Sequence, residues 1–134
     1  MKDNFNILGI GIDLVEVDRI KRLINKYPKF LNRFFTKNEI NYCNDKKNRY
    51  IHFAGRFAAK EAVIKSIGVG NKSLKLKEIE INNMSNTNNN SIPKVILHGS
   101  ALSLANKRDI EEILISITHT KEYAIAIAYA RGIR

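Results

Sequence analysis

The feature that most constrains the fold is an alanine-rich segment that can only be a covered helix. From Tyr50 to Ile67 the chain has no proline and no glycine after Gly55, so it favours one long helix. Its helical wheel has two apolar sectors, one with Ala59, Val63 and Ile67 and one with Phe57 and Ile64. Little of this helix can face water, so we expect other elements to cover it. We expect Gly68 and Gly70 to end it.

The segment Ile7–Leu14 predicts a strand with two different faces. Leu8, Ile10, Ile12 and Leu14 alternate with Gly9, Gly11 and Asp13, which is the two-residue period of a strand. The aliphatic face predicts burial. The glycine face leaves room for another backbone or a ligand, and the Asp13 carboxylate stands at the end of this cleared strip.

The remaining segments predict an α+β fold, a single compact domain over residues 1–134 with an antiparallel sheet and the long buried helix. One helix is expected to start at Asp18 as its cap, and a second at the capping box of Thr36 and Glu39, running through Cys43. The other expected elements are strands at Leu74–Ile81 and Lys94–Leu97, a mobile polar loop at Asn82–Ser91, a helix at Ser100–Glu112, and a hairpin of Ile113–Thr118 and Tyr123–Tyr129. In the last strand, Ala124, Ala126 and Ala128 share one face that is flat enough for close packing.

Length and composition exclude several protein classes. With 134 residues, 44% of them hydrophobic, the chain can build one core. No apolar run reaches the roughly 18 residues of a membrane span, and the N-terminus lacks the apolar core of a secretory signal, so we expect a soluble, cytoplasmic protein with no membrane partner. Cys43 is the single cysteine, which excludes an intramolecular disulfide and a cysteine-based zinc site.

The net charge of +10 predicts anionic partners. Nucleic acid, anionic lipid, a phosphorylated small molecule and an acidic protein all satisfy such a charge. Arg19, Arg22 and Lys26 recur at helical spacing, which indicates either a solvated face or a surface that docks an acidic helix. Lys46, Lys47 and Arg49 form a second cluster, suited to a terminal phosphate.

Two carboxylates are the candidates for chemistry. Glu61 and Lys65 have the spacing of an ordinary helix ion pair, but burial of such a pair costs several kcal/mol per ion unless a ligand or metal offsets it. Asp13 alone fits a strand end. Asp13 and Glu61 together could supply the one or two protein ligands of Mg²⁺ when phosphates and water complete its shell. Lys65 would then face the same phosphates.

Other familiar site patterns are missing. The three histidines, at positions 52, 98 and 119, have no metal-ligand spacing. Gly9 and Gly11 lack the third glycine of a dinucleotide-binding turn, and the sequence has no phosphate-binding P-loop.

Four segments resemble the holo-acyl-carrier-protein synthases. They are GIGIDLVEVDRI at Gly9–Ile20, FTKNE at Phe35–Glu39, FAGRFAAKEAVIK at Phe53–Lys65 and SITHTKEYA at Ser116–Ala124. They occur in the expected order over most of the chain. The resemblance implies a phosphopantetheinyl-transferase-like fold and Mg²⁺-dependent transfer of 4'-phosphopantetheine from coenzyme A to a serine of an acidic apo-acyl-carrier protein, for fatty acid synthesis.

The resemblance also implies roles for individual residues. Asp13 and Glu61 would bind Mg²⁺, and Lys65 would hold the transferred phosphate, which makes these three the catalytic candidates. The nucleotide of coenzyme A would contact Lys47, Arg49, Arg56, Thr118 and His119. The acidic carrier would contact Arg19, Arg22, Lys26 and Lys29.

Members of this family are similar in forming homotrimers with active sites at subunit interfaces, and the alanine face of Tyr123–Tyr129 offers a surface for such packing.

Two alternatives to the transferase function stay open. One is a non-enzymatic binder of a phosphorylated ligand or nucleic acid, which the charge supports, although no aromatic stacking motif is interleaved with the basic residues and the resemblance implies no nucleic-acid partner. The other is a trimeric scaffold without activity.

Overall fold

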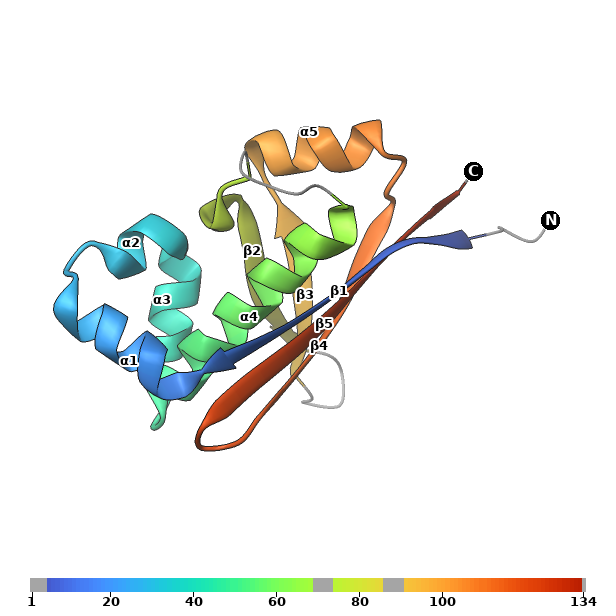
Figure 1. Cartoon of the computed structure of the whole chain (residues 1–134). Coiled ribbons are helices and arrows are strands. Elements are labelled where there is room, and N and C mark those ends of the chain that lie inside the picture. The colour runs from blue at the N-terminus through green and yellow to red at the C-terminus, as the bar shows by residue number, and fades with distance from the viewer. Residues whose placement is uncertain (1–4, 69–73, 86–90, 134) are drawn as a thin grey trace.

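The computed structural model describes residues 5–68, 74–85 and 91–133, and they form an α+β fold in which one long helix lies across a sheet (Figure 1). The sheet has the antiparallel order β1-β5-β4, and a second sheet pairs β2 with β3. In chain order the elements are β1 (Phe5–Glu16), α1 (Val17–Lys26), α2 (Phe30–Phe34), α3 (Lys37–Asn44), α4 (Arg49–Ile67), the 3-10 helix η1 (Leu76–Glu78), β2 (Ile79–Ser85), β3 (Ser91–Leu97), α5 (Gly99–Lys107), β4 (Glu112–His119) and β5 (Tyr123–Ile133).

Helix α4 is the long covered helix that the sequence predicts. It ends at Gly68, whose φ of 83° is the left-handed conformation that glycine adopts without strain. Gly70 lies outside the described residues. Eleven of the 19 residues of α4 are buried, among them Ala58, Ala59 and Ala62.

The alanines of β5 form the floor on which α4 lies. Ala124, Ala126 and Ala128 are at most 1% exposed, whereas Ile125 and Ile127 between them point outward and are 38% and 44% exposed. The alternation is therefore confirmed. The interpretation of the alanine face as a surface for a neighbouring subunit is wrong, because α4 of the same chain already covers that face.

The glycines of β1 bring the α4 backbone directly onto the strand. A Cβ atom on Gly11 would lie 1.9 Å from the carbonyl oxygen of Ala62, and one on Gly9 would lie 1.9 Å from that of Ser66. Only glycine tolerates such an approach. The cleared face of the strand thus receives another backbone, which is one of the two outcomes expected for it.

The other face of β1 is exposed, contrary to the prediction of a buried aliphatic face. Ile10, Ile12 and Leu14 are 58–59% exposed. Ile12 lies opposite Ile127 and Leu14 opposite Ile125, so that these side chains continue across the sheet. We call this surface the outer apolar face; its members are Ile10, Ile12, Leu14, Tyr123, Ile125 and Ile127. Alternation identified the two faces correctly but could not tell which one the chain itself would cover.

Helix starts and loop bounds differ in places from the expectations. The capping box is present, with Thr36 N donating to Glu39 Oε1 at 2.8 Å and Glu39 N donating to Thr36 Oγ1 at 3.2 Å. The predicted cap at Asp18 is wrong, because α1 begins one residue earlier and Asp18 lies in its first turn, 3.5 Å from Arg22.

The second sheet extends into the segment predicted as a loop. Asn82 pairs with Lys94 and Ser85 with Ser91, so the ends of Asn82–Ser91 are strand, while residues 86–90 lie outside the described part. The predicted strand Leu74–Ile81 begins instead with η1. The helix predicted at Ser100–Glu112 is α5, which already ends at Lys107. Asp109, two residues later, has a φ of 60°. Polar composition misled the loop prediction, since two polar strands can pair at a surface.

A buried ion pair ties the helices to the second sheet. Lys60 Nζ lies 2.7 Å from Glu39 Oε1, and both side chains are fully buried. Lys60 also donates to the carbonyls of Leu76 and Ile79, at 3.0 and 2.8 Å, and Glu39 accepts from Ile81 N at 3.0 Å. Every polar atom of the pair thus has a partner, which is the condition for burying two charges. In the described parts of the chain, no helix is long and apolar enough to cross a membrane.

Candidate active site

The three predicted catalytic residues come together on the flank of α4 that faces β1. Lys65 Nζ lies 3.3 Å from Asp13 Oδ1 and also donates to the carbonyl of Ile12 at 2.9 Å. Glu61 lies one turn before Lys65 on the helix. The close packing at Gly11 brings this turn of α4 onto β1, because a Cβ there would meet Lys65 Cβ at 2.8 Å. The glycine strip therefore positions the site.

The Glu61 carboxyl group experiences the negative charge of Asp13. Burial raises the pKa of Glu61, and repulsion from the Asp13 carboxylate raises it further, while Lys65 and Arg19 act in the opposite direction. Two carboxylates that oppose each other's charge form a donor set that a cation would stabilise. The set fits Mg²⁺, which takes one or two carboxylates from protein and completes its shell with phosphate and water. Within the described residues, no group of three or more histidine, cysteine or acidic side chains could hold a metal by itself.

The opposite flank of α4 carries Arg56 and faces His119 at the end of β4. His119 pairs with Ala124 in the sheet and Asp13 with Ala126, so β5 and the helix above it separate the two flanks. The His119 ring centroid lies 5.9 Å from that of His52. His52 precedes Arg56 by one helical turn and lies 6.1 Å from the ring of Tyr42.

The Arg56 side chain is 4% exposed and is held in place by two neighbouring side chains. Its guanidinium carbon lies 4.0 Å from the centroid of Tyr42, and its Nη2 donates to Asn83 Oδ1 at 3.1 Å. The amide nitrogen of Asn83 donates to the Tyr42 hydroxyl at 2.7 Å, which locks both side chains. Among the described residues, Arg56 Nε is buried and has no hydrogen-bond partner, so an acceptor atom of a ligand could pair with it.

The other predicted nucleotide contacts lie elsewhere in the chain. Lys47 and Arg49 line a cleft of about 510 Å³ together with Lys21 and Lys121. Thr118 pairs with Ile125 and therefore belongs to the outward side of the sheet, whereas His119 belongs to the side that α4 covers. One chain thus does not gather all five residues into a single pocket.

The predicted carrier-binding residues follow α1 and the turn after it. Arg19 and Lys29 line a cleft of about 440 Å³ whose floor includes Leu23, Phe30 and Phe57. Arg22 and Lys26 lie on the same helix but outside the cleft. The Arg22 side chain is 3.5 Å from Asp18, and Lys26 Nζ is 5.4 Å from the ring of Tyr27.

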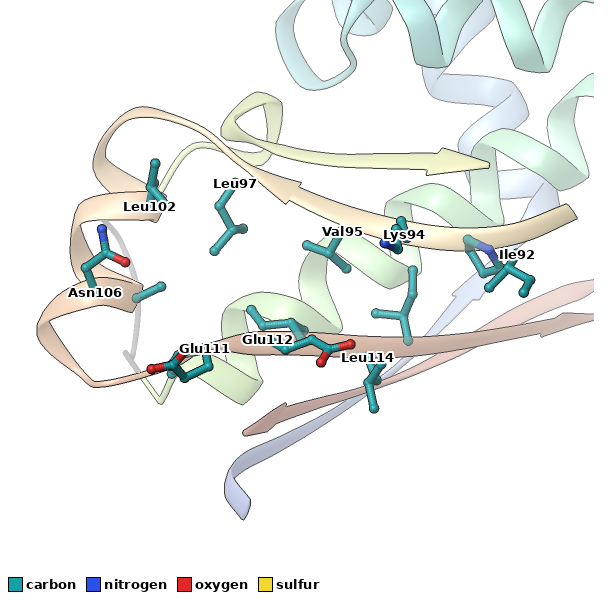
Figure 2. A pocket seen from close by; sticks show the side chains of 14 residues that line it. Ile92, Lys94, Val95, Leu97, Leu102, Asn106, Glu111, Glu112 and Leu114 are labelled. Carbon is teal, nitrogen blue, oxygen red and sulfur yellow. The ribbon is translucent and has the colours of Figure 1, made fainter. Parts of the chain in front are cut away.

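A further cleft, of about 390 Å³, contains none of the predicted site residues. It separates β3 from β4 and is closed at one end by α5 (Figure 2). Its lining is mostly aliphatic, with Val95, Leu97 and Leu114 among its members and Lys94 and Glu112 at polar positions. This composition offers no catalytic pair.

Tyr42, His52 and Asn83 lie beside the candidate residue Arg56, and sequence reasoning did not predict this grouping. One signal was present, because His52 and Arg56 are four residues apart and so share a helix face. Nothing in the sequence placed Tyr42 or Asn83 beside them.

Comparisons with known proteins agree on one family. The family model of the 4'-phosphopantetheinyl transferase superfamily matches residues 9–128. The chain is 44% identical, over 93% of its length and 88% of the relative's, to a holo-[acyl-carrier-protein] synthase of Thermoanaerobacter sp. (strain X514). Its fold is similar to the holo-ACP-synthase of Plasmodium yoelii, with a TM-score of 0.83, 30% identity and coverage of 98% and 99%. It also resembles the Helicobacter pylori holo-[acyl-carrier-protein] synthase in complex with coenzyme A, with a TM-score of 0.75, 32% identity and coverage of 90% and 98%.

Proposed function

The chain belongs to the holo-acyl-carrier-protein synthases of the 4'-phosphopantetheinyl transferase superfamily, and from this membership we propose that it works with Mg²⁺, takes coenzyme A as donor and serves fatty acid synthesis. Enzymes of this family transfer phosphopantetheine to an apo-acyl-carrier protein. The solved complex of a relative with coenzyme A supports coenzyme A as the donor here.

The observation that carries the proposal is the meeting of Asp13, Glu61 and Lys65 on one flank of α4. Asp13 and Glu61 would hold the metal ion, which supplies positive charge to the pyrophosphate when bound. Lys65 would neutralise charge that develops on the transferred phosphoryl group, and its bond to the Ile12 carbonyl keeps the ammonium group in place for this. Relief of the repulsion between the two carboxylates favours the metal-bound state.

We place the nucleotide of coenzyme A against Arg56, His119, Lys47, Arg49 and Thr118. These residues lie on the other flank of α4, in the cleft lined by Lys21 and Lys121, and on the outward side of the sheet, away from Asp13. A site shared between two chains would account for this separation. The outer apolar face supports a homotrimer, since a continuous apolar surface of this kind is typical of an interface. Active sites would then lie at the subunit interfaces.

The acidic carrier protein would dock at the cleft of Arg19 and Lys29. Its apolar floor can take a side chain of a partner helix, while the basic residues at its rim, with Arg22 and Lys26 on the same helix, attract carboxylates. The prediction of an acidic partner depends on this pairing of charges.

Mass spectrometry of an apo-acyl-carrier protein tests the function. Incubation with the enzyme, coenzyme A and Mg²⁺ should add one phosphopantetheine, and a chelator should stop the reaction until Mg²⁺ is restored. Asp13→Ala and Glu61→Ala should abolish the mass gain with an unchanged circular dichroism spectrum, whereas Glu111→Ala, an exposed acid at another place, should not. Coenzyme A binding without any mass gain would instead favour a non-enzymatic binder.

A further inference from the structure

Four cationic or potentially cationic side chains gather on the flank of α4 that faces β4. We call Lys46, His52, Arg56 and His119 the cationic cluster. Lys46 Nζ lies 4.6 Å from the Tyr42 ring, which Arg56 also contacts, and the two histidine rings lie 5.9 Å apart. Among the ion pairs in the described part of the chain, none involves a member of this cluster. In the described part of the chain, no carboxylate therefore lies within ion-pair distance of the cationic cluster.

His52 sits at the centre of this arrangement. The rings of Tyr42 of α3 and His119 of β4 both form T-shaped contacts with its ring, at centroid distances of 6.1 and 5.9 Å. Arg56 follows it on α4, and Lys46 approaches from the loop after α3. The ionisable groups that act on its imidazole are Arg56, His119 and Lys46, and none of them is an acid. A proton on the free ring meets only repulsion.

We propose that His52 couples the binding of a phosphate monoester at the cationic cluster to the uptake of a proton, so that the phosphorylated nucleotide binds more tightly as the pH falls. The inference rests on the proposed function, because that function supplies the nucleotide. It adds a residue outside the predicted contacts and gives it a specific task. The bound phosphate supplies the negative charge that the cluster lacks, and the His52 imidazole then takes up a proton.

The direction of the effect follows from the two states of the ring. In the free protein, burial first and then the neighbouring cations lower the pKa of His52 below its ordinary value. A phosphate dianion beside the ring favours the imidazolium and raises the pKa. Affinity then increases as the pH falls through the pKa of the complex, by about tenfold for each unit by which binding raises the pKa. The gain ends below the pKa of the free protein.

Nuclear magnetic resonance of the histidine side chains measures the coupling directly. The pKa of His52 in the full-length protein is determined without ligand, with coenzyme A, and with dephospho-coenzyme A, which lacks the phosphate monoester. We expect coenzyme A to raise this pKa and dephospho-coenzyme A to leave it nearly unchanged. His98 is the internal control, because it is not a member of the cationic cluster. Its Nε2 lies 3.1 Å from Glu80 Oε1, and coenzyme A should leave its resonances unchanged.

Calorimetry of His52→Gln gives an independent measurement. Titration of coenzyme A in two buffers with different protonation enthalpies reports the protons taken up, and the variant should take up fewer than the parent protein and than His98→Gln. Equal proton uptake in His52→Gln, or an unchanged His52 pKa in the complex, would overturn the inference while leaving the transferase function intact. A failure of coenzyme A to bind at any pH would instead overturn the proposed function and this inference with it.

Discussion

Glu61 is a residue whose position favours function over stability. Burial and the Asp13 carboxylate both raise its pKa, which means that the folded chain resists the charge that a metal ligand must carry. The folded pKa lies above the unfolded one. The contribution of Glu61 to stability is therefore fully present below the unfolded pKa, near 4.5, and is lost as the pH rises through the folded pKa.

Glu61→Gln should separate activity from stability. We expect transfer to fall by roughly 100-fold or more, because the charge at the metal site is lost. The midpoint of thermal unfolding at neutral pH without metal should be equal to or higher than that of the parent chain, and this difference should vanish near pH 4, where the carboxyl group is neutral. Scanning calorimetry at the two pH values, beside the transfer assay, checks both points. A large loss of stability at neutral pH would show that Glu61 serves the fold.

Lys60 has the opposite role, although it adjoins Glu61 in sequence. Its ammonium group has three buried partners, Glu39 and the carbonyls of Leu76 and Ile79. Lys60→Met should cost about 3–5 kcal/mol in urea denaturation, since it leaves the Glu39 carboxylate buried without its cation. Lys107→Met, at an exposed helix position, should cost little. If Lys60→Met unfolds at the same urea concentration as the parent chain, the pair is not a structural one.

Residue chemistry could be predicted only where the sequence marks a face. Asp13, Glu61 and Lys65 were predicted together because a glycine strip and a covered helix each left one place for charge. Lys60 received no role and Glu39 only that of a helix cap, since their pairing joins residues from two elements whose contact no local pattern reveals. The grouping of His52 with Tyr42 and Asn83 was missed for the same reason.

At the scale of elements, the contact between α4 and β1 determines the geometry of the site. Two glycines let the helix backbone rest on the strand, and the alanines of β5 continue this low floor toward β4. The strand predicted at Ile7–Leu14 and the helix predicted at Tyr50–Ile67 are both present, as β1 and α4. Their contact was only half predicted, because the cleared strip suited a ligand as well as a backbone. The helix at Phe30–Phe34 and the polar strand ends beyond Asn82 were not predicted, since short or polar elements lack a clear period.

Gly11→Ala should disturb both the fold and the site. Its Cβ would lie 1.9 Å from the Ala62 carbonyl oxygen, so α4 must move away from β1 at a cost of about 1–3 kcal/mol. Transfer activity should drop further than stability, because Asp13 separates from Glu61 and Lys65. Gly55→Ala is the matched control, as its Cβ would meet only the Ile117 side chain, at 3.0 Å. Urea denaturation and the transfer assay on both variants measure the two effects. Equal activity in the two variants would contradict the positioning role of Gly11.

Within the described residues, the sheet of β1, β5 and β4 is covered on one side only. Helix α4 covers the alanine side, while Ile10, Ile12 and Leu14 on the other side are more than half exposed. A monomer rarely exposes a continuous apolar surface of this extent. The proposed homotrimer would bury it, and would bring the outward Thr118 toward a second chain.

Ile127→Glu tests the assembly. A carboxylate in the middle of the outer apolar face should prevent subunits from packing, so light scattering after gel filtration should report a monomer. Transfer should fall with it, because the shared site is then incomplete. Leu102→Glu, an equally exposed substitution on α5, should leave mass and activity unchanged. A parent chain that is itself monomeric and fully active would exclude the trimer.

The alternation in β5 has a practical consequence for protein engineering. Odd positions from 123 to 127 carry bulky side chains that point away from α4, and even positions from 124 to 128 carry the alanines beneath it. A directed-evolution library confined to the odd positions would explore new quaternary arrangements, whereas one confined to the even positions would lift or tilt α4 and thereby change its distance from the strands beneath it. A single strand thus contains two alternating sets of positions, one that governs subunit packing and one that governs the placement of α4.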